Sequence, residues 1–234
     1  MNEQQDFSYI RRNLESIRAR ADAAAAASPY GQPYELLLAT KYATADENNY
    51  AHALGVHKIG ENRVQSLLEK YDALHRDGLD IHFIGSLQKN KVKYIIDKVS
   101  MIESLDSLPL AEEIERQAAK QDKVMDCLIE VNIGREAQKG GIMPEDAADF
   151  AEKVALFKHI RLCVIMTMAP KCTDAGDYRK YFRESYHIFI DICEKKLHNV
   201  DRHVLSMGMS QSFEAALAEG ATLIRVGRAV FEKE

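Results

Sequence analysis

The side chain with the clearest chemical potential is Lys41, a lysine that directly follows an apolar run. The run Leu36–Thr40 reads Leu-Leu-Leu-Ala-Thr and has the composition of a buried strand. A lysine at the end of such a strand is expected to be partly desolvated, which favours the neutral and nucleophilic amine. That amine suits a Schiff base with a carbonyl compound. The alternative is a lysine that leaves the strand into solvent, and position alone does not separate the two.

Two glycine-containing segments near the C-terminus have the composition of anion-binding loops. Ser206–Ser210 reads Ser-Met-Gly-Met-Ser, and Arg225–Arg228 reads Arg-Val-Gly-Arg. Gly208 and Gly227 allow the backbone to approach a phosphate closely. The simpler interpretation of Ser210 is an ordinary helix N-cap. A phosphate loop that faces a nucleophilic lysine points to pyridoxal phosphate, because this compound carries both an aldehyde and a phosphate.

The histidines and cysteines are expected to have structural roles or to be exposed to solvent. His52, His57 and His82 lack the spacing of metal ligands, and the four cysteines form no CxxC pair. We therefore expect no metal site. The histidines are expected on the surface or in the core, and the cysteines as reduced thiols of a cytosolic protein.

Eight short apolar runs alternate with segments of helical spacing, and this alternation has to position the residues above. The runs are Glu35–Thr40, His57–Gly60, Ile81–Gly85, Met101–Ser104, Val124–Asn132, Ile160–Met166, His203–Ser206 and Thr222–Val226. Strands that alternate with helices form parallel βαβ units, and eight units close into a barrel of about 250 residues. The sequence therefore predicts an α/β protein with a single domain over 1–234, a (β/α)8 TIM barrel. A doubly wound open sheet is the alternative.

The predicted helices complete this barrel. A capping box opens a helix at Thr44, apolar residues around Val92 indicate another, and a short one is expected over Gln211–Glu219. Few residues follow the eighth strand, so an N-terminal helix within 1–28 is expected to pack on the barrel in its place. Active sites of such barrels lie at the carboxyl ends of the strands, where Lys41 and the two glycine loops fall.

Composition limits the partners of this chain. The 234 residues include 31 basic and 36 acidic side chains, a formal net charge of −5, which disfavours a broad nucleic-acid surface. No apolar run reaches the roughly 18 residues of a membrane span, and the N-terminus lacks an apolar leader. We expect a cytoplasmic protein, a monomer that binds no nucleic acid and no membrane.

The motifs of the chain, taken together, resemble those of the pyridoxal phosphate homeostasis proteins. They occur in the order of that family and cover nearly the whole sequence. The segments that carry the resemblance are Ala39-Thr-Lys41, Gly60-Glu-Asn-Arg-Val-Gln65, His82-Phe-Ile-Gly-Ser-Leu-Gln-Lys-Asn-Lys91, Ile129-Glu-Val-Asn-Ile133, Lys139-Gly-Gly-Ile142, Met166-Thr-Met-Ala-Pro170, Leu205-Ser-Met-Gly-Met-Ser210 and Arg225-Val-Gly-Arg-Ala-Val-Phe231.

The resemblance implies a fold like the N-terminal barrel of alanine racemase, with pyridoxal 5′-phosphate held as an aldimine on Lys41. It places the phosphate near Ser210, Gly227 and Arg228, and the pyridine nitrogen near Arg225. It also implies a protein that buffers or delivers the cofactor in vitamin B6 homeostasis, with pyridoxal-phosphate-dependent apoenzymes as partners. The other cofactor-binding residues that it implies are Asn62, Ser206 and Met209.

Five positions depart from the family pattern. Arg63 and Ser66 stand where an aromatic and an acidic residue are expected, and Ser212 replaces an acidic residue. Val164-Ile165 stands where a small residue is usual. The departures leave Lys41 in place but weaken any role for the loop after the second strand.

Two further functions stay open. One is a pyridoxal-phosphate-dependent enzyme that acts on amino acids, such as a racemase. Alanine racemase adds a C-terminal β-domain whose tyrosine is the second acid/base, and we expect this chain, which ends at Glu234, to lack that group. The other is a cofactor-free Schiff-base aldolase, which would be colourless where a cofactor aldimine is yellow. The carrier interpretation assigns Lys41 a binding role and no catalytic residue.

Overall fold

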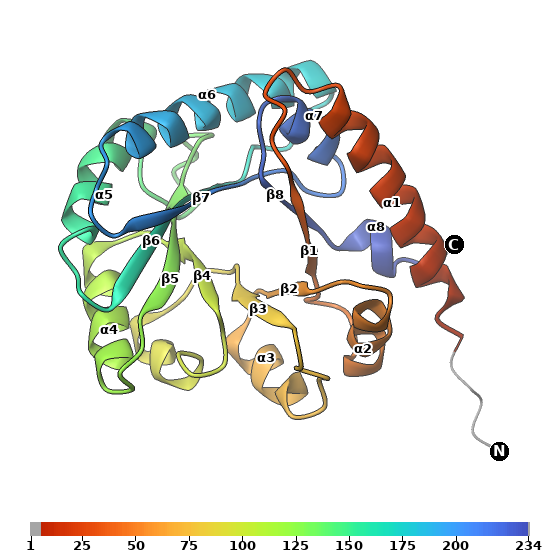
Figure 1. Cartoon of the computed structure of the whole chain (residues 1–234), viewed down its shortest axis with the longest axis horizontal. Coiled ribbons are helices and arrows are strands. Elements are labelled where there is room, and N and C mark those ends of the chain that lie inside the picture. The colour runs from red at the N-terminus through yellow and green to blue at the C-terminus, as the bar shows by residue number, and fades with distance from the viewer. Residues whose placement is uncertain (1–5, 234) are drawn as a thin grey trace.

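The computed structural model describes residues 6–233, with the backbone alone for residues 201–203, and contains a closed barrel of eight parallel strands (Figure 1). Each strand pairs with the next along the chain, and the last pairs with the first, with Leu36 opposite Ile224. The predicted barrel is thus confirmed and the open sheet is excluded. The strands are β1 Glu35–Ala39, β2 Lys58–Glu61, β3 Asp80–Phe83, β4 Met101–Leu105, β5 Met125–Val131, β6 Ile160–Thr167, β7 Val200–Ser206 and β8 Leu223–Val226.

Helices connect the strands and cover the outside of the barrel. The capping box at Thr44 is present, because its side chain accepts from the Glu47 backbone while the Glu47 carboxylate accepts from the Thr44 backbone. The helix expected around Val92 is a 3₁₀ helix, η1. The helical segments are α1 Ser8–Ala26, α2 Ala45–Ala53, α3 Val64–Tyr71, η1 Lys89–Tyr94, α4 Leu108–Ala119, η2 Pro144–Asp146, α5 Ala147–Val154, α6 Ala175–Glu194, α7 Phe213–Ala218 and α8 Arg228–Phe231.

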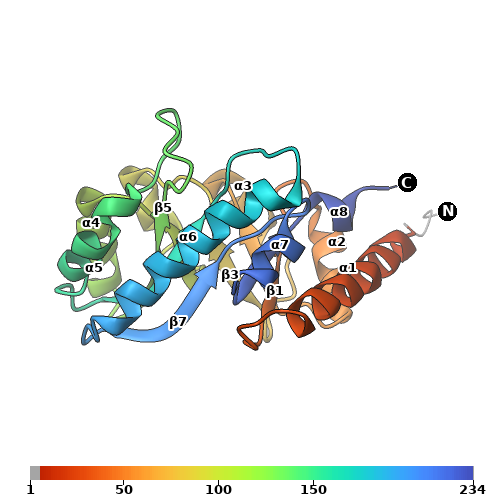
Figure 2. The same cartoon turned by 90° about the horizontal axis from the view of Figure 1, so that it is seen from above.

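The helix after β8 is very short, and α1 lies beside it. α1 packs against α7 and α8, as Figures 1 and 2 show. The Asn13 side chain donates hydrogen bonds of 3.1 Å to the carbonyls of Val230 and Glu232, at the end of α8. Carbonyls at the end of a helix have no partner within it, so α1 supplies one. Residues 1–5 and 234 of the predicted domain lie outside the described residues.

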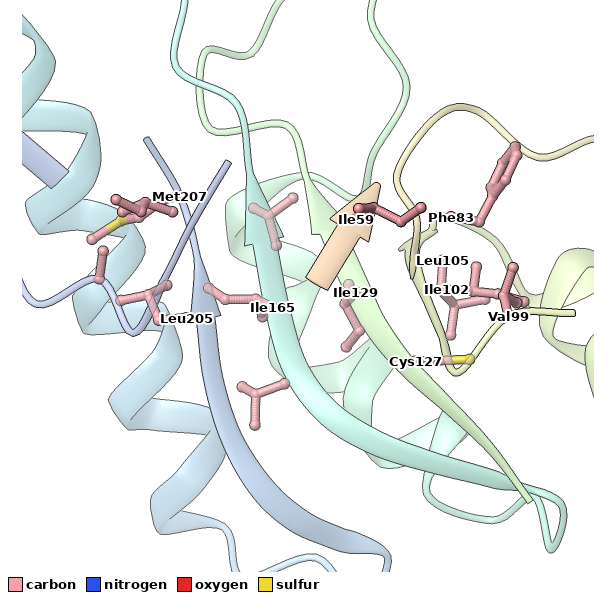
Figure 3. Packing of buried hydrophobic residues seen from close by; sticks show 14 of the residues in the cluster. Ile59, Phe83, Val99, Ile102, Leu105, Cys127, Ile129, Ile165, Leu205 and Met207 are labelled. Carbon is pink, nitrogen blue, oxygen red and sulfur yellow. The ribbon is translucent and has the colours of Figure 1, made fainter. Parts of the chain in front are cut away.

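Alternating side chains divide the core into an outer layer and a barrel interior. Cys127, Ile129 and Val131 of β5 belong to the large outer cluster, part of which Figure 3 shows. Leu128, between them in sequence, packs instead with Met101 in a smaller cluster. Because neighbouring side chains on a strand point to opposite faces, the smaller cluster fills the barrel. Polar residues of the same phase, above all Glu130, therefore face the barrel axis.

A bulge in β6 changes which of its side chains face the barrel interior. Its register with β5 and with β7 shifts between Leu162 and Val164, and Val164 has a φ of 114°. Such an angle is strained for a β-branched residue. Val164 and Ile165 both join the outer cluster, and Met166 then enters the interior one. The departure noted at Val164-Ile165 thus coincides with a backbone feature that directs the end of β6.

Candidate functional site

A cavity of about 260 Å³ opens at the carboxyl ends of the strands. The loops after β5 and β6 project from the barrel in the view from above (Figure 2). Residues from β1, β8 and the loops that follow β2, β3, β6 and β7 surround the cavity, so residues far apart in sequence meet there. Its lining consists of Ala39, Lys41, Tyr42, Asn62, Ile84, Met168, Tyr178, Met209, Ser210, Gln211, Ser212, Arg225, Gly227, Arg228 and Phe231.

Most residues expected at a cofactor site line this single cavity. Ser206 does not, because it is fully buried and its hydroxyl is engaged by neighbouring side chains. A lysine amine, an arginine and a glycine loop thus share one opening. The expected residues in the lining are Lys41, Asn62, Met209, Ser210, Arg225, Gly227 and Arg228.

Lys41 is exposed, so the expectation that the end of the strand desolvates it is wrong. The strand ends at Ala39, and Lys41 belongs to the turn that follows. Its amine lies 4.6 Å from the centroid of the Tyr42 ring, which is 80% exposed. Within residues 6–233 no hydrogen bond or ion pair engages the Lys41 amine. It is therefore free to react with a ligand in the cavity.

The loops after β7 and β8 form a cradle of backbone donors. The Ser210 hydroxyl accepts long hydrogen bonds of 3.4 Å from the Gly227 and Ala229 N–H groups. Among the described residues, no acceptor pairs with the Arg228 N–H. A side chain at Gly227 would place its Cβ 2.6 Å from the Ala39 carbonyl oxygen, so only glycine fits there. One free N–H group, two N–H groups in long hydrogen bonds and a glycine are the components of an anion site.

Ser210 is not a helix cap, contrary to the simpler interpretation of the sequence. α7 begins at Phe213, later than the expected Gln211, and Ser212 occupies its N-cap position. The Ser212 hydroxyl accepts a hydrogen bond of 3.2 Å from the Met209 N–H and so stabilises the loop. The departure at Ser212 thus has a structural role, and the Ser210 hydroxyl stays beside the cavity.

Arg225 reaches the cavity from a buried hydrogen-bond network. Its guanidinium donates to the Ser206 hydroxyl at 2.6 Å and to the Thr167 carbonyl at 2.9 Å. Ser206 in turn donates to Glu103 at 2.7 Å, and His82 Nδ1 lies 2.6 Å from the other Glu103 oxygen. All these side chains are buried, which confirms a core role for His82. The network fixes the direction of the guanidinium.

The charges of this network stabilise each other. Burial alone would raise the pKa of Glu103, but the hydrogen bond and charge of His82, with the charge of Arg225, lower it overall. Burial also lowers the pKa of Arg225, and Glu103 and Glu130 oppose that change. Glu103 lies 4.0 Å from Arg225. Glu103 is therefore an ionised counter-charge that keeps a buried guanidinium protonated.

The Glu130 carboxyl group faces the barrel interior near Arg225. Glu130 is 8% exposed at the end of β5, and no hydrogen bond to its carboxyl group occurs within residues 6–233. Burial and the charge of Asp106 raise its pKa to about 7, and Arg225 opposes them. The protonated form therefore persists in the folded protein far above the ordinary value of 4.5.

We expect Glu130→Gln to stabilise the protein by roughly 1–3 kcal/mol above pH 7. A raised folded-state pKa means that the unfolded chain loses its proton first as the pH rises. The stability of the native protein therefore falls between pH 4.5 and about 7, whereas an amide has no such loss. Urea unfolding of both proteins from pH 4 to pH 8 measures the difference. A constant difference across that range would contradict the raised pKa.

Sequence reasoning missed several residues of the site. Ile84 and Met168 directly follow β3 and β6, so the rule that active sites lie at strand ends could have found them. Tyr178 comes from α6 and carries no such signal. The buried Glu103 was also missed, since its partners lie on other strands. Within residues 6–233 no cluster of histidine, cysteine or acidic residues could hold a metal ion, and no helix is long and apolar enough to cross a membrane.

Comparison with known proteins finds relatives over nearly the whole chain. The family model of the alanine racemase N-terminal domain matches residues 5–233. The pyridoxal phosphate homeostasis protein of Aquifex aeolicus is 41% identical over 197 residues, which cover 84% of this chain and 86% of that protein. A crystal structure of an unknown protein from Bifidobacterium adolescentis has a TM-score of 0.88 at 33% identity and 98% coverage of both chains. PipY of Synechococcus elongatus PCC7942, solved with PLP bound, has a TM-score of 0.82 at 27% identity, with 95% of this chain and 100% of that chain covered.

Proposed function

Because the chain belongs to the family of pyridoxal phosphate homeostasis proteins with the alanine racemase N-terminal fold, we propose that it binds pyridoxal 5′-phosphate and buffers or delivers it. The relative PipY was solved with this cofactor bound. The observation that carries the proposal is one cavity that combines the free amine of Lys41 with the donor cradle at Ser210 and Gly227. The amine matches the aldehyde of the cofactor, and the donor cradle matches its phosphate.

Each residue of the cavity has a distinct task in this proposal. When bound, the cofactor supplies an aldehyde that condenses with an amine and releases water. Lys41 supplies that amine. The Ser210 hydroxyl and the Gly227 and Arg228 N–H groups hold the phosphate, and Arg225 faces the pyridine nitrogen. The remaining proposed contacts are Asn62 and Met209 in the lining and Ser206 through its hydrogen bond to Arg225.

Arg225 is the reason to favour a carrier over an enzyme. A guanidinium only donates hydrogen bonds, so a ring nitrogen that accepts from it stays unprotonated. Without a protonated ring nitrogen as the electron sink, a carbanion formed on this cofactor is poorly stabilised. Racemisation of free amino acids at about 1 s⁻¹ or faster would support the enzyme instead.

We further propose that the carrier acts in the cytoplasm as a monomer. Its recipients would be apoenzymes that need the cofactor.

Borohydride reduction of the cofactor-loaded protein, followed by peptide mass mapping, tests the proposal. We expect the cofactor mass on the peptide that contains Lys41. The physical reason is that its amine has no hydrogen-bonding partner among the described residues, whereas Lys58 and Lys70 are engaged in ion pairs. A cofactor mass on a different lysine would contradict the assignment. A colourless protein that takes up no cofactor would contradict the function.

A further inference from the structure

An ion pair between a buried carboxylate and a half-buried lysine lies beneath the turn that carries Lys41, outside the lining of the cavity. Glu61, at the end of β2, has a side chain that is 1% exposed, and Lys70 of α3 contacts it with a side chain that is 15% exposed. The Lys70 amine also donates to the Thr40 carbonyl at 2.9 Å and to the Ala43 carbonyl at 3.1 Å. The Thr40 hydroxyl donates to Glu61 at 2.7 Å. The pair therefore holds both ends of one short segment.

That segment is a four-residue turn with Lys41 and Tyr42 at its centre. The Ala43 N–H donates to the Thr40 carbonyl at 3.0 Å and closes the turn. Its two central side chains are exposed, so packing does not order them. Its end residues, Thr40 and Ala43, are buried. Besides the hydrogen bond that closes the turn, one ammonium group joins its two end carbonyls, and one carboxylate joins this ammonium to Thr40.

The contacts also distinguish two lysines, Lys70, whose amine is fully engaged, and Lys41, whose amine is not. An ammonium group has three donors, and Lys70 uses them on Thr40, Ala43 and Glu61. The Lys70 amine thus has no donor left for a ligand. Lys41, on the turn that Lys70 fixes, keeps an amine without hydrogen bonds among the described residues.

We propose that Lys70 and Glu61 form a clamp that positions the Lys41 amine for bond formation with the cofactor. This rests on the proposed function, because it concerns how Lys41 is presented to the aldehyde. Bond formation requires an attacking amine at the right place and angle, and a misplacement of about 1 Å can slow a reaction by about a hundredfold. Without the clamp the exposed turn would sample many conformations, and few of them would direct Lys41 into the cavity.

The double variant Lys70→Met/Glu61→Gln tests the clamp, because it leaves no uncompensated buried charge. Thr40→Val is the milder variant, since it removes the hydroxyl that contacts the Glu61 carboxylate at 2.7 Å and the Gly60 carbonyl at 3.3 Å, and removes no charge. Lys58→Met is the matched control. The Lys58 side chain is also 15% exposed and paired with carboxylates, Asp80 and Glu35, but at the start of β2.

Three quantities are measured for the wild-type protein and for each variant. The first is the rate at which pyridoxal phosphate loads Lys41, trapped by borohydride and counted by peptide mass. The second is the affinity for pyridoxamine 5′-phosphate, which has the ring and phosphate but no aldehyde. The third is amide hydrogen exchange at residues 40–43 in the cofactor-free protein, which reports the order of the turn.

We expect the double variant to load Lys41 about tenfold more slowly or worse, with pyridoxamine phosphate affinity changed by less than about twofold. Exchange at Ala43 should be faster. Thr40→Val should slow loading by about two- to tenfold, which keeps the test decisive if the double variant does not fold. Lys58→Met should leave all three measurements unchanged.

Two results would overturn the clamp alone. One is a wild-type loading rate in both Lys70→Met/Glu61→Gln and Thr40→Val. The other is a loss of pyridoxamine phosphate affinity equal to the loss of loading rate, because the whole cavity would then be disturbed. A wild-type protein that never loads Lys41 contradicts the proposed function itself, and the positioning role is then overturned with it.

Discussion

Lys41→Ala is expected to abolish covalent retention of pyridoxal phosphate while leaving the affinity for pyridoxamine 5′-phosphate within about tenfold of wild type. In the proposed site the phosphate and ring contacts belong to Ser210, Gly227 and Arg225, which line the cavity, so the loss of the amine would leave them in place. A hydrogen bond to a charged group contributes about 1.5–3 kcal/mol, and several remain. Lys70 cannot replace Lys41, because its three donors are engaged.

The measurement is the mass of the borohydride-treated protein, combined with titration by pyridoxamine 5′-phosphate. Lys93→Ala is the control, since Lys93 is an exposed lysine of η1 outside the lining of the cavity. It should retain the cofactor fully. If the cofactor mass persists in Lys41→Ala on another lysine, the free amine of Lys41 does not determine the site of attachment.

The fold could be predicted because its pattern is local and repeated. Each apolar run lies close to an observed strand, and eight of them in alternation with helices leave few arrangements. The exceptions have local causes. η1 is a single 3₁₀ segment because apolar spacing does not distinguish tight from regular helices. β7 begins at Val200, before the expected His203, and the polar residues Asp201 and Arg202 between them interrupt the apolar run.

Residue types and strand order predicted which residues meet at the site, but not the surroundings of each side chain. The carboxyl ends of parallel strands converge, so Lys41, Ser210 and Arg225 were expected to meet, and they do. The surroundings of each side chain were not predictable. The exposure of Lys41 depends on β1 ending at Ala39, one residue before the expected Thr40. Glu103 contacts His82 and Ser206, which lie on strands that are distant in sequence.

Glu103→Leu is expected to lower the free energy of unfolding by about 3–5 kcal/mol at pH 7. The variant removes the counter-charge of Arg225, whose side chain is 3% exposed. It also leaves His82 and the Ser206 hydroxyl without their carboxylate partner. An uncompensated buried cation costs more than the lost packing of one carboxylate, so the effect should exceed that of an ordinary core substitution.

Glu219→Leu is the matched control for that prediction. The Glu219 carboxylate is equally buried, with a side chain that is 2% exposed, but its partners Arg179 and Arg183 are 47% and 56% exposed. Those arginines regain water when the carboxylate is removed, so we expect a loss of only about 1 kcal/mol. Urea titration of both variants measures the two losses. Equal losses would mean that the burial of Arg225 does not set the cost, and that Glu103 acts only as a hydrogen-bond acceptor.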